Sequence, residues 1–183
     1  MPDLETPRLR LRRFRLSDLD AVFNLVSDLA VAKWTARIPH PYERKMAEEW
    51  FQLMDRLRDE GQSLSLAITL KEDGTLIGAV SFEIESEPGQ AEIGYYLGRS
   101  FWGHGYMTEA AAAALDHGFG PLGFNLVRAD AFRENEASAR VLGKLGFVDR
   151  GPVKLEAPAR GGMVDGIART LSRDEWAARR NEA

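Results

Sequence analysis

The chain contains 183 residues, of which 44% are hydrophobic and 28% are charged, with no cysteine and a formal net charge of -4 at pH 7. This length supports one hydrophobic core, so we expect a single domain over residues 1–183. The lack of cysteine excludes disulfides and thiolate chemistry, and the acidic balance argues against general nucleic-acid binding. No apolar run is long enough to cross a membrane and no signal-peptide core is found, so we expect a cytoplasmic protein without membrane contact.

The N-terminal third predicts one strand followed by two helices. Arginine and leucine alternate over residues 8–14, which predicts a half-buried strand with a solvated basic face. Ser17, with Asp20 three residues later, is a candidate N-cap of the first helix. The apolar positions of that helix are Val22, Phe23, Val26 and Leu29. The second helix ends before Gly61, and its apolar face carries Met46, Trp50, Leu53, Met54 and Leu57.

The middle of the chain predicts three strands and a long helix. Apolar residues alternate over residues 64–70 and again over residues 76–84, with a turn between them, which predicts a β-hairpin. A third strand covers residues 91–97. An alanine-rich helix then extends to Phe119, and the loop before it contains Gly98, Gly103 and Gly105.

The C-terminal third predicts further alternation of strands and helices. Strands are expected at residues 126–132, from residue 147 onward and around residues 164–171. A helix is expected at residues 136–145, ended by Gly146, and a capping box from Ser172 to Glu175 begins a last short helix. Because antiparallel hairpins come first and a βαβα unit follows, we expect an α/β (α+β) domain whose mixed, mostly antiparallel central sheet is flanked by helices.

The glycine-containing loop is a candidate anion site. A helix N-terminus presents unpaired backbone N–H groups and partial positive charge, and glycine lets the backbone approach an anion closely. Two nucleotide-binding signatures are absent: no lysine follows Gly105 as a P-loop requires, and Thr108 occupies the place of the third glycine of the dinucleotide fingerprint. ATP and NAD are therefore not favoured, and a tight turn without a ligand is the structural alternative.

Two separated segments resemble the GCN5-related N-acetyltransferase (GNAT) superfamily, in particular its RimJ/RimL-type branch. The first, WGHGYM, is similar to the pyrophosphate-binding loop of the superfamily, although Trp102 replaces its Gln or Arg and Met107 its final Gly or Ala. The second, NEASARVLGKLGF at residues 135–147, is similar to the Asn-x-x-Ser segment of the branch. The segments LETPRLRLR and DGIARTLSRDEW extend the resemblance over nearly the whole chain.

The resemblance implies acetyl-CoA as the cosubstrate. The loop would hold the pyrophosphate mainly through backbone N–H groups, and the strand before it would lie beside the thioester. Lys144 would lie near the phosphates, with a solvated helix position as the alternative. The implied coenzyme-binding residues are Tyr95, Tyr96, Leu97, Trp102, Gly103, His104, Gly105, Tyr106, Met107, Thr108, Asn135 and Lys144.

The resemblance also indicates candidate catalytic residues. Acetyl transfer to an amine needs a base and a proton for the departing thiolate. Glu92 is the first candidate for the base, with a solvated strand carboxylate as the alternative and Glu83 and Glu85 in reserve. Ser138 is the candidate proton donor, with a helix-start hydroxyl as the alternative. Trp34 lies in a segment that often walls the acceptor site in this branch, although a core aromatic is equally consistent; Trp34 and Glu83 are the expected substrate-binding residues.

The three histidines show no metal-binding spacing, so we expect no metal. His117 is most simply a cation at a helix C-terminus. The sequence thus indicates an N-acetyltransferase, monomeric or homodimeric, that acts on a primary amine of a protein N-terminus or a small molecule by direct attack in a ternary complex. The alternative is a non-catalytic acetyl-CoA-binding sensor or scaffold.

Overall fold

The computed structural model describes residues 3–182, whose strands form one eight-stranded sheet in the order β1-β2-β3-β4-β5-β6-β8-β7. The strands are β1 (Leu4–Glu5), β2 (Leu9–Arg12), β3 (Ser63–Leu70), β4 (Leu76–Ile84), β5 (Gln90–Leu97), β6 (Leu126–Phe132), β7 (Val148–Ala157) and β8 (Gly162–Ser172). Neighbouring strands are antiparallel except β5 and β6, which run parallel. This confirms the mixed, mostly antiparallel sheet that the order of elements predicted.

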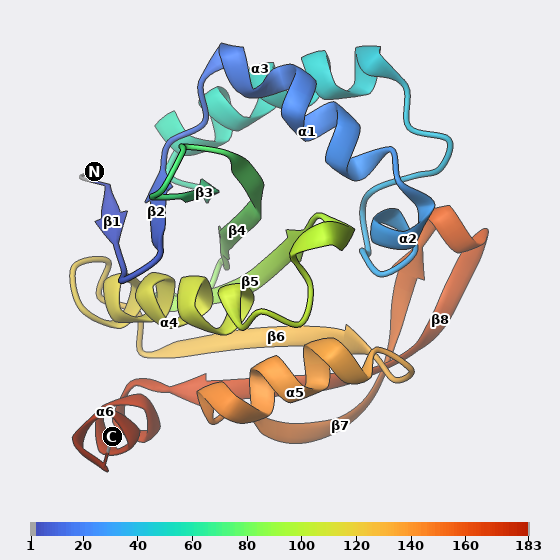
Figure 1. Cartoon of the computed structure of the whole chain (residues 1–183). Coiled ribbons are helices and arrows are strands. Elements are labelled where there is room, and N and C mark those ends of the chain that lie inside the picture. Colours follow the sequence, from blue (N-terminus) through green and yellow to red (C-terminus); the bar gives the residue numbers. More distant parts are fainter. Residues whose placement is uncertain (1–2, 183) are drawn as a thin grey trace.

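Helices cover both faces of the sheet (Figure 1). α1 and α3 lie over one face, α4 and α5 lie over the other, and α6 ends the chain beside β8. The α-helices are α1 (Leu19–Val26), α2 (Leu29–Ala32), α3 (Arg44–Asp59), α4 (Tyr106–Phe119), α5 (Glu136–Leu145) and α6 (Arg173–Glu182). Short 3-10 helices are η1 (Leu16–Asp18), η2 (Arg99–Phe101) and η3 (Pro158–Arg160). Within residues 3–182, no helix has the length and apolarity that crossing a membrane requires.

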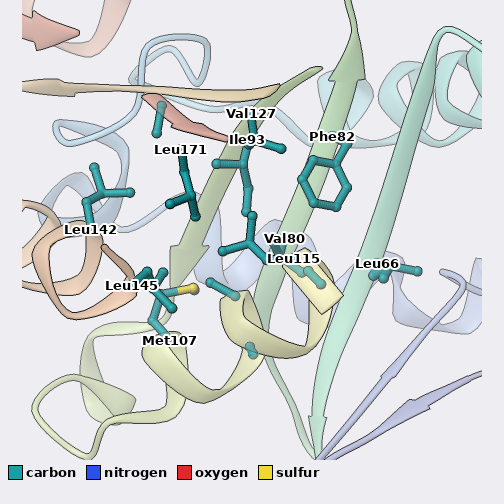
Figure 2. Close-up of a cluster of buried hydrophobic side chains, with 14 of the residues drawn as sticks. Leu66, Val80, Phe82, Ile93, Met107, Leu115, Val127, Leu142, Leu145 and Leu171 are labelled. Atoms are coloured by element: carbon teal, nitrogen blue, oxygen red, sulfur yellow. The ribbon is translucent and has the colours of Figure 1, made fainter. Parts of the chain in front are cut away.

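The main core lies between the sheet and the helices α4 and α5. Figure 2 shows Met107 and Leu115 of α4 and Leu142 and Leu145 of α5 beside strand side chains that include Phe82. Alternation along each strand places these apolar residues on one face. The core therefore fixes α4, and with it the N-terminus of α4, against the middle of the sheet.

Several local predictions are confirmed. β3 and β4 form the expected antiparallel hairpin, and α5 has the predicted bounds, with Gly146 following it at a φ of 90°. The predicted capping box is also formed, since Ser172 N donates to the Glu175 carboxylate at 2.7 Å and Glu175 N donates to Ser172 Oγ at 3.3 Å. In each case the signal lies within a few consecutive residues.

The prediction for the first helix is wrong in two respects. Leu29 belongs to the separate helix α2, and Ser17 lies inside η1 rather than capping α1. The acidic side chain that organises this region is Asp18, which is 7% exposed. Its carboxylate accepts hydrogen bonds from both Arg12 Nη atoms, at 2.7 and 2.9 Å, and from the Arg15 amide at 2.8 Å. The start of the first helix is therefore held by the contact of Asp18 in η1 with Arg12 in β2, and not by the predicted Ser17 cap.

His117 lies in the last turn of α4 as expected, but it is not the cation predicted there. It is 8% exposed, and its Nε2 atom has no hydrogen-bond partner among the described residues. Burial lowers the pKa of His117 because the charged imidazolium is poorly solvated there. The residue therefore packs as a neutral side chain.

The ion pair of Arg12 and Asp18 makes a testable contribution to stability. Burial alone raises the pKa of Asp18, but the hydrogen bonds from Arg12 and the Arg15 amide outweigh burial and hold the pKa below its usual value. Asp18→Asn leaves the Arg12 charge without its partner, so we expect the free energy of unfolding at pH 7 to fall by about 3 kcal/mol in urea titrations.

The stability that this ion pair contributes should depend on pH in one direction. A lowered folded-state pKa means that the stabilisation is complete above the unfolded-state value of about 3.9 and is lost as pH falls through the folded-state value. The difference between wild type and Asp18→Asn should therefore shrink in strong acid. Asp20→Asn is the control, because Asp20 pairs with Arg44 at an exposed position and should matter much less. Equal unfolding midpoints for wild type and Asp18→Asn at pH 7 would contradict the assignment.

Candidate active site

The candidate active site lies where the sheet opens between its two parallel strands. β5 and β6 pair only through Gln90 with Leu126, Ala91 with Val127 and Glu92 with Arg128. Beyond this point β5 stays with β4 and β6 stays with β8. A cavity of about 1120 Å³ occupies the opening, and its walls come from both faces of the sheet.

The N-terminus of α4 forms one wall of this cavity. α4 connects β5 to β6, so its first turn lies beyond the carboxyl end of β5, where ligands bind in parallel βαβ units. Gly103 and Gly105 have φ values of 80° and 78°, which side-chain-bearing residues rarely adopt. Gly105 is the N-cap and no side chain caps the helix, so the backbone N–H groups of the first turn are available to an anion.

The predicted loop residues divide into two groups. Those that line the cavity are Trp102, Gly103, Gly105, Tyr106, Met107 and Thr108. His104 is not among the lining residues; its ring stacks on that of Tyr106, with the ring centroids 5.7 Å apart. Trp102 is 41% exposed, and its Nε1 donates to the Leu97 carbonyl at 2.8 Å. The indole therefore ties the loop to the end of β5.

A second attachment of the loop, through Arg8, was not predicted from the sequence. Arg8 Nη1 donates to the His104 carbonyl at 2.9 Å, and the guanidinium lies 4.5 Å from the centroid of the Tyr106 ring. Arg8 also forms an ion pair of 2.6 Å with Glu109 in the first turn of α4, and the Thr6 hydroxyl donates to the same carboxylate at 2.6 Å. These contacts hold the loop and the start of α4 in one arrangement.

The same contacts affect the ionisation of Glu109. Burial alone raises the pKa of Glu109, but hydrogen bonds from Thr6, from the Arg8 amide and from the Arg8 side chain together lower it. Glu109 is therefore charged at neutral pH. Arg8 belongs to the N-terminal segment LETPRLRLR, which supported the family resemblance. The sequence alone, however, indicated no role for Arg8.

The predicted residues of β5 meet the start of α5 across the cavity. The hydroxyls of Tyr95 and Ser138 share a hydrogen bond of 2.9 Å. Asn135 is the N-cap of α5, and its side chain accepts from the Ser138 amide at 3.0 Å. The cap is thus supplied by Asn135, which leaves the Ser138 hydroxyl directed to Tyr95 at the cavity wall. Burial raises the pKa of Tyr95 to about 12, so its hydroxyl keeps its proton at neutral pH.

The remaining predicted coenzyme residues also lie around the cavity. Tyr96 and Leu97 are lining residues of β5, and Tyr96 packs with the cluster of Val22 and Val26 under α1. Lys144 lies in the last turn of α5, where it is exposed and lines the cavity. An exposed lysine there gives the α5 side of the cavity a positive charge.

The opposite face of the sheet supplies a chamber with aromatic and acidic walls. Trp34 lines it, and the Lys33 ammonium and the Arg160 guanidinium lie 5.3 and 5.9 Å from the centroid of its ring. Glu83 forms an ion pair with Arg37, a residue that sequence reasoning did not identify. The apolar face of α3 also borders this chamber, and its Leu53 is 37% exposed as a result.

Glu92 lies in this chamber and is the last residue of β5 that pairs with β6. Its side chain is half-buried, and its carboxylate makes no hydrogen bond or ion pair with other side chains in the described part of the chain. Burial raises the pKa of Glu92, and the negative charges of Asp130 and Glu83 raise it further, while Arg37 and Arg128 oppose the change. A carboxylate with a raised pKa is a better base near neutral pH than an ordinary one.

Asp130 of β6 is a second carboxylate that was not predicted. Its side chain is 11% exposed, it lines the cavity, and its Oδ1 atom has no hydrogen-bond partner within residues 3–182. Burial raises the pKa of Asp130, although Arg128 and Arg169 oppose the change. The alternation of side chains in β6 predicts that Asp130 lies on the same face as Arg128. The distance between the Asp130 carboxylate and the nearest cation could not be predicted from the sequence.

The cavity therefore combines an anion site at α4, a pair of hydroxyls at β5 and α5, and acidic groups on the opposite side. The free N–H groups at Gly105 and the absence of a side chain there fit a pyrophosphate. Within residues 3–182, no cluster of three or more histidine, aspartate or glutamate side chains could hold a metal ion. The arrangement suits group transfer from an anionic carrier to a cationic acceptor.

Comparison with known proteins agrees with this geometry. The sequence profile of the acetyltransferase (GNAT) domain matches residues 8–148. The chain is 35% identical over 178 residues to the N-acetyltransferase p20 of Bacillus licheniformis, which covers 97% of this chain and 99% of that protein. It is 30% identical over 154 residues to the N-acetyltransferase YoaA of Bacillus subtilis, covering 84% and 86%.

Solved structures with the same fold include ribosomal-protein acetyltransferases. The ribosomal-protein-S5-alanine acetyltransferase of Vibrio fischeri has a TM-score of 0.80 and 25% identity, covering 96% of this chain and 99% of that one. A RimL ribosomal L7/L12 alpha-N-protein acetyltransferase in complex with coenzyme A has a TM-score of 0.85 and 22% identity, covering 95% and 99%.

These matches extend over most of the chain and include the loop, both strands of the opening and α5. They favour a catalytic protein over the non-catalytic sensor or scaffold considered from the sequence. The chain belongs to the GNAT family of N-acetyltransferases.

Proposed function

We propose that this N-acetyltransferase transfers the acetyl group of acetyl-CoA to a primary amine by direct attack in a ternary complex. The observation that carries the proposal is the cavity through the sheet, which joins the anion site at α4 to the acidic chamber that contains Glu92. Acetyl-CoA supplies an activated thioester carbonyl when it is bound. The acceptor would be an α-amine of a protein N-terminus or a small-molecule amine, and the α-N-protein specificity named for the RimL neighbour supports the first class.

In this proposal, groups of the protein bind the coenzyme and transfer the two protons of the reaction. The N–H groups at the start of α4, fixed by Arg8 and Trp102, bind the pyrophosphate. The carboxylate of Glu92 takes the proton that the amine releases as its nitrogen bonds to the carbonyl carbon. The Ser138 hydroxyl gives a proton to the sulfur as the carbon–sulfur bond breaks. Tyr95 is 2.9 Å from Ser138 and can return a proton to it.

Coenzyme binding is tested by thermal and chemical unfolding. Acetyl-CoA at 100 times its dissociation constant should stabilise the fold by about 2.7 kcal/mol, and ATP and NADH should have little effect. Gly105→Glu should abolish the response, because it places a side chain and a negative charge in the anion site.

A matched control separates lost binding from backbone strain. Gly74 has a φ of 77° in the turn between β3 and β4, close to that of Gly105, and open space around it. Gly74→Glu should therefore introduce similar strain but keep the response to acetyl-CoA. Stabilisation by ATP instead of acetyl-CoA would overturn the proposed coenzyme.

The role of Ser138 is tested by steady-state kinetics. If its hydroxyl protonates the leaving sulfur only as the bond breaks, Ser138→Ala should lower kcat by about 10²-fold and leave the Michaelis constant for acetyl-CoA nearly unchanged. Tyr95→Phe removes the hydrogen-bond partner alone and should lower kcat less. The reverse order of effects would assign the donor to Tyr95, and an unchanged kcat in Ser138→Ala would remove Ser138 from the mechanism.

The role of Glu92 is tested by the pH dependence of kcat/KM. The base must be ionised to act, so a raised pKa places the acidic fall of activity above the ordinary carboxylate value of about 4.3. Glu92→Gln should lower kcat/KM by about 10²-fold or more at pH 7. For an α-amine acceptor the loss should be partly rescued above about pH 8, where the free amine predominates, and for a lysine-like amine only well above about pH 9.

The shape of that profile distinguishes other roles. A loss that does not vary with pH would show that Glu92 binds the acceptor's charge and does not accept its proton. No loss at any pH would leave Glu83 or a water chain as the base.

A further inference from the structure

A second cavity, of about 490 Å³, lies at the C-terminal end of α4, away from the proposed anion site. The ends of α3, α4 and β4, the start of β3 and the loop between α4 and β6 surround it. Its apolar walls are Leu64, Ile84, Leu122 and Phe124. The volume is within the range of small-molecule sites.

His117 supplies an unpaired polar atom to this cavity. The side chain lines the cavity and is 8% exposed, and its Nε2 atom is shielded from solvent without a hydrogen-bond partner within residues 3–182. A buried nitrogen without a partner destabilises a fold, and a ligand that hydrogen-bonds to it removes that cost. The proposed acetyl transfer makes no use of His117.

The wall formed by Phe124 is fixed by contacts with distant segments. Arg173 Nε donates to the Phe124 carbonyl at 2.8 Å. The Phe124 ring meets the ring of Phe82 edge to face, with the centroids 5.3 Å apart, and a Cβ atom added at Gly118 would lie only 3.0 Å from the Phe124 ring. Because this wall is already in place, little of the chain has to be ordered when a ligand binds.

The charges around the cavity favour a neutral ligand. Among the described residues Arg58 is the charged lining residue, and it is paired with Asp55 at 2.5 Å and with Asp59 at 2.9 Å. A carboxylate ligand would have to compete with both aspartates, and an ammonium ligand would meet no lining carboxylate from residues 3–182. A hydroxyl group suits His117, because it can donate to Nε2 or accept from it, whichever ring nitrogen carries the proton.

We propose that this cavity is a second ligand site, which takes a neutral phenol or aromatic alcohol whose hydroxyl hydrogen-bonds to His117 Nε2 and whose ring packs against Phe124. Ile84 and Leu122 are 37% and 39% exposed, so a ring bound there also covers apolar surface that otherwise faces water. The site lies apart from the loop that holds Gly105 and does not depend on acetyl transfer.

The test compares p-cresol with toluene, which lacks the hydroxyl group, in NMR titrations of the wild-type protein. Ser63 and Ile84 line both cavities, but Leu122 lines the second cavity alone and Trp34 lines the active-site cavity alone. The methyl signals of Leu122 and the indole signal of Trp34 therefore report the two cavities separately. At the Leu122 signals p-cresol should bind at least about 10-fold more tightly than toluene, and saturating coenzyme A should not change this ratio.

A variant at His117 tests which atom holds the hydroxyl group. His117→Phe keeps an aromatic ring and removes Nε2, so it should lower the affinity for p-cresol to that for toluene and leave toluene binding unchanged. His40→Phe makes the same substitution at an exposed position that lines neither cavity, and it should keep the 10-fold preference.

The wild-type titrations can overturn the inference without any variant. Equal affinities for p-cresol and toluene at the Leu122 signals, or no change of these signals with either compound, would refute the site. Changes confined to the Trp34 signal would assign the binding to the active-site cavity instead. A preference for p-cresol that survives in His117→Phe would show that His117 does not hold the hydroxyl group.

Discussion

The separation of β5 from β6 after Glu92 is the constraint on which the rest of the site depends. Three residue pairs hold the two strands together, and beyond them each strand is retained by its antiparallel neighbour. The facing edges are therefore kept apart without a strand between them, and their backbone polar groups are available to a ligand. This opening connects the face covered by α4 and α5 to the face covered by α1 and α3, so a carrier and an acceptor can meet from opposite sides.

The proposed anion site at the start of α4 is held in place by contacts within the chain. Arg8 and Thr6, from the N-terminal segment, contact the first turn of α4 through Glu109, and Trp102 ties the loop to β5. Fixing the loop in advance reduces the conformational entropy that binding would otherwise remove. The turn between β1 and β2 thus holds the loop and the start of α4 in place.

The acidic side chains of the protein lie in two contrasting environments. Asp18 is buried with two guanidinium hydrogen bonds and a backbone amide, so its charge supports the fold. Glu92 and Asp130 are shielded from water at the cavity without such partners, and burial raises the pKa of both carboxyl groups. Arg37 and Arg128 are each held by another carboxylate and do not compensate them fully.

The sequence by itself determined the order of elements, the mixed sheet, the glycine loop before α4 and the capping of α6. These features depend on hydrophobic period, turn residues and caps, which are encoded within a few consecutive residues. The family resemblance also indicated Glu92 and Ser138, and the structure places both at the same cavity, although their roles stay predictions.

The tertiary structure alone decided which side chains meet. Arg8 contacts Glu109 across 101 positions of sequence, Tyr95 contacts Ser138 across 43, and Asp130 keeps only a 3.9 Å contact with Arg128, which lies closer to Glu85. The burial of Asp18 and His117 was decided in the same way, because burial and ionisation depend on the packing of distant segments, which no local pattern specifies.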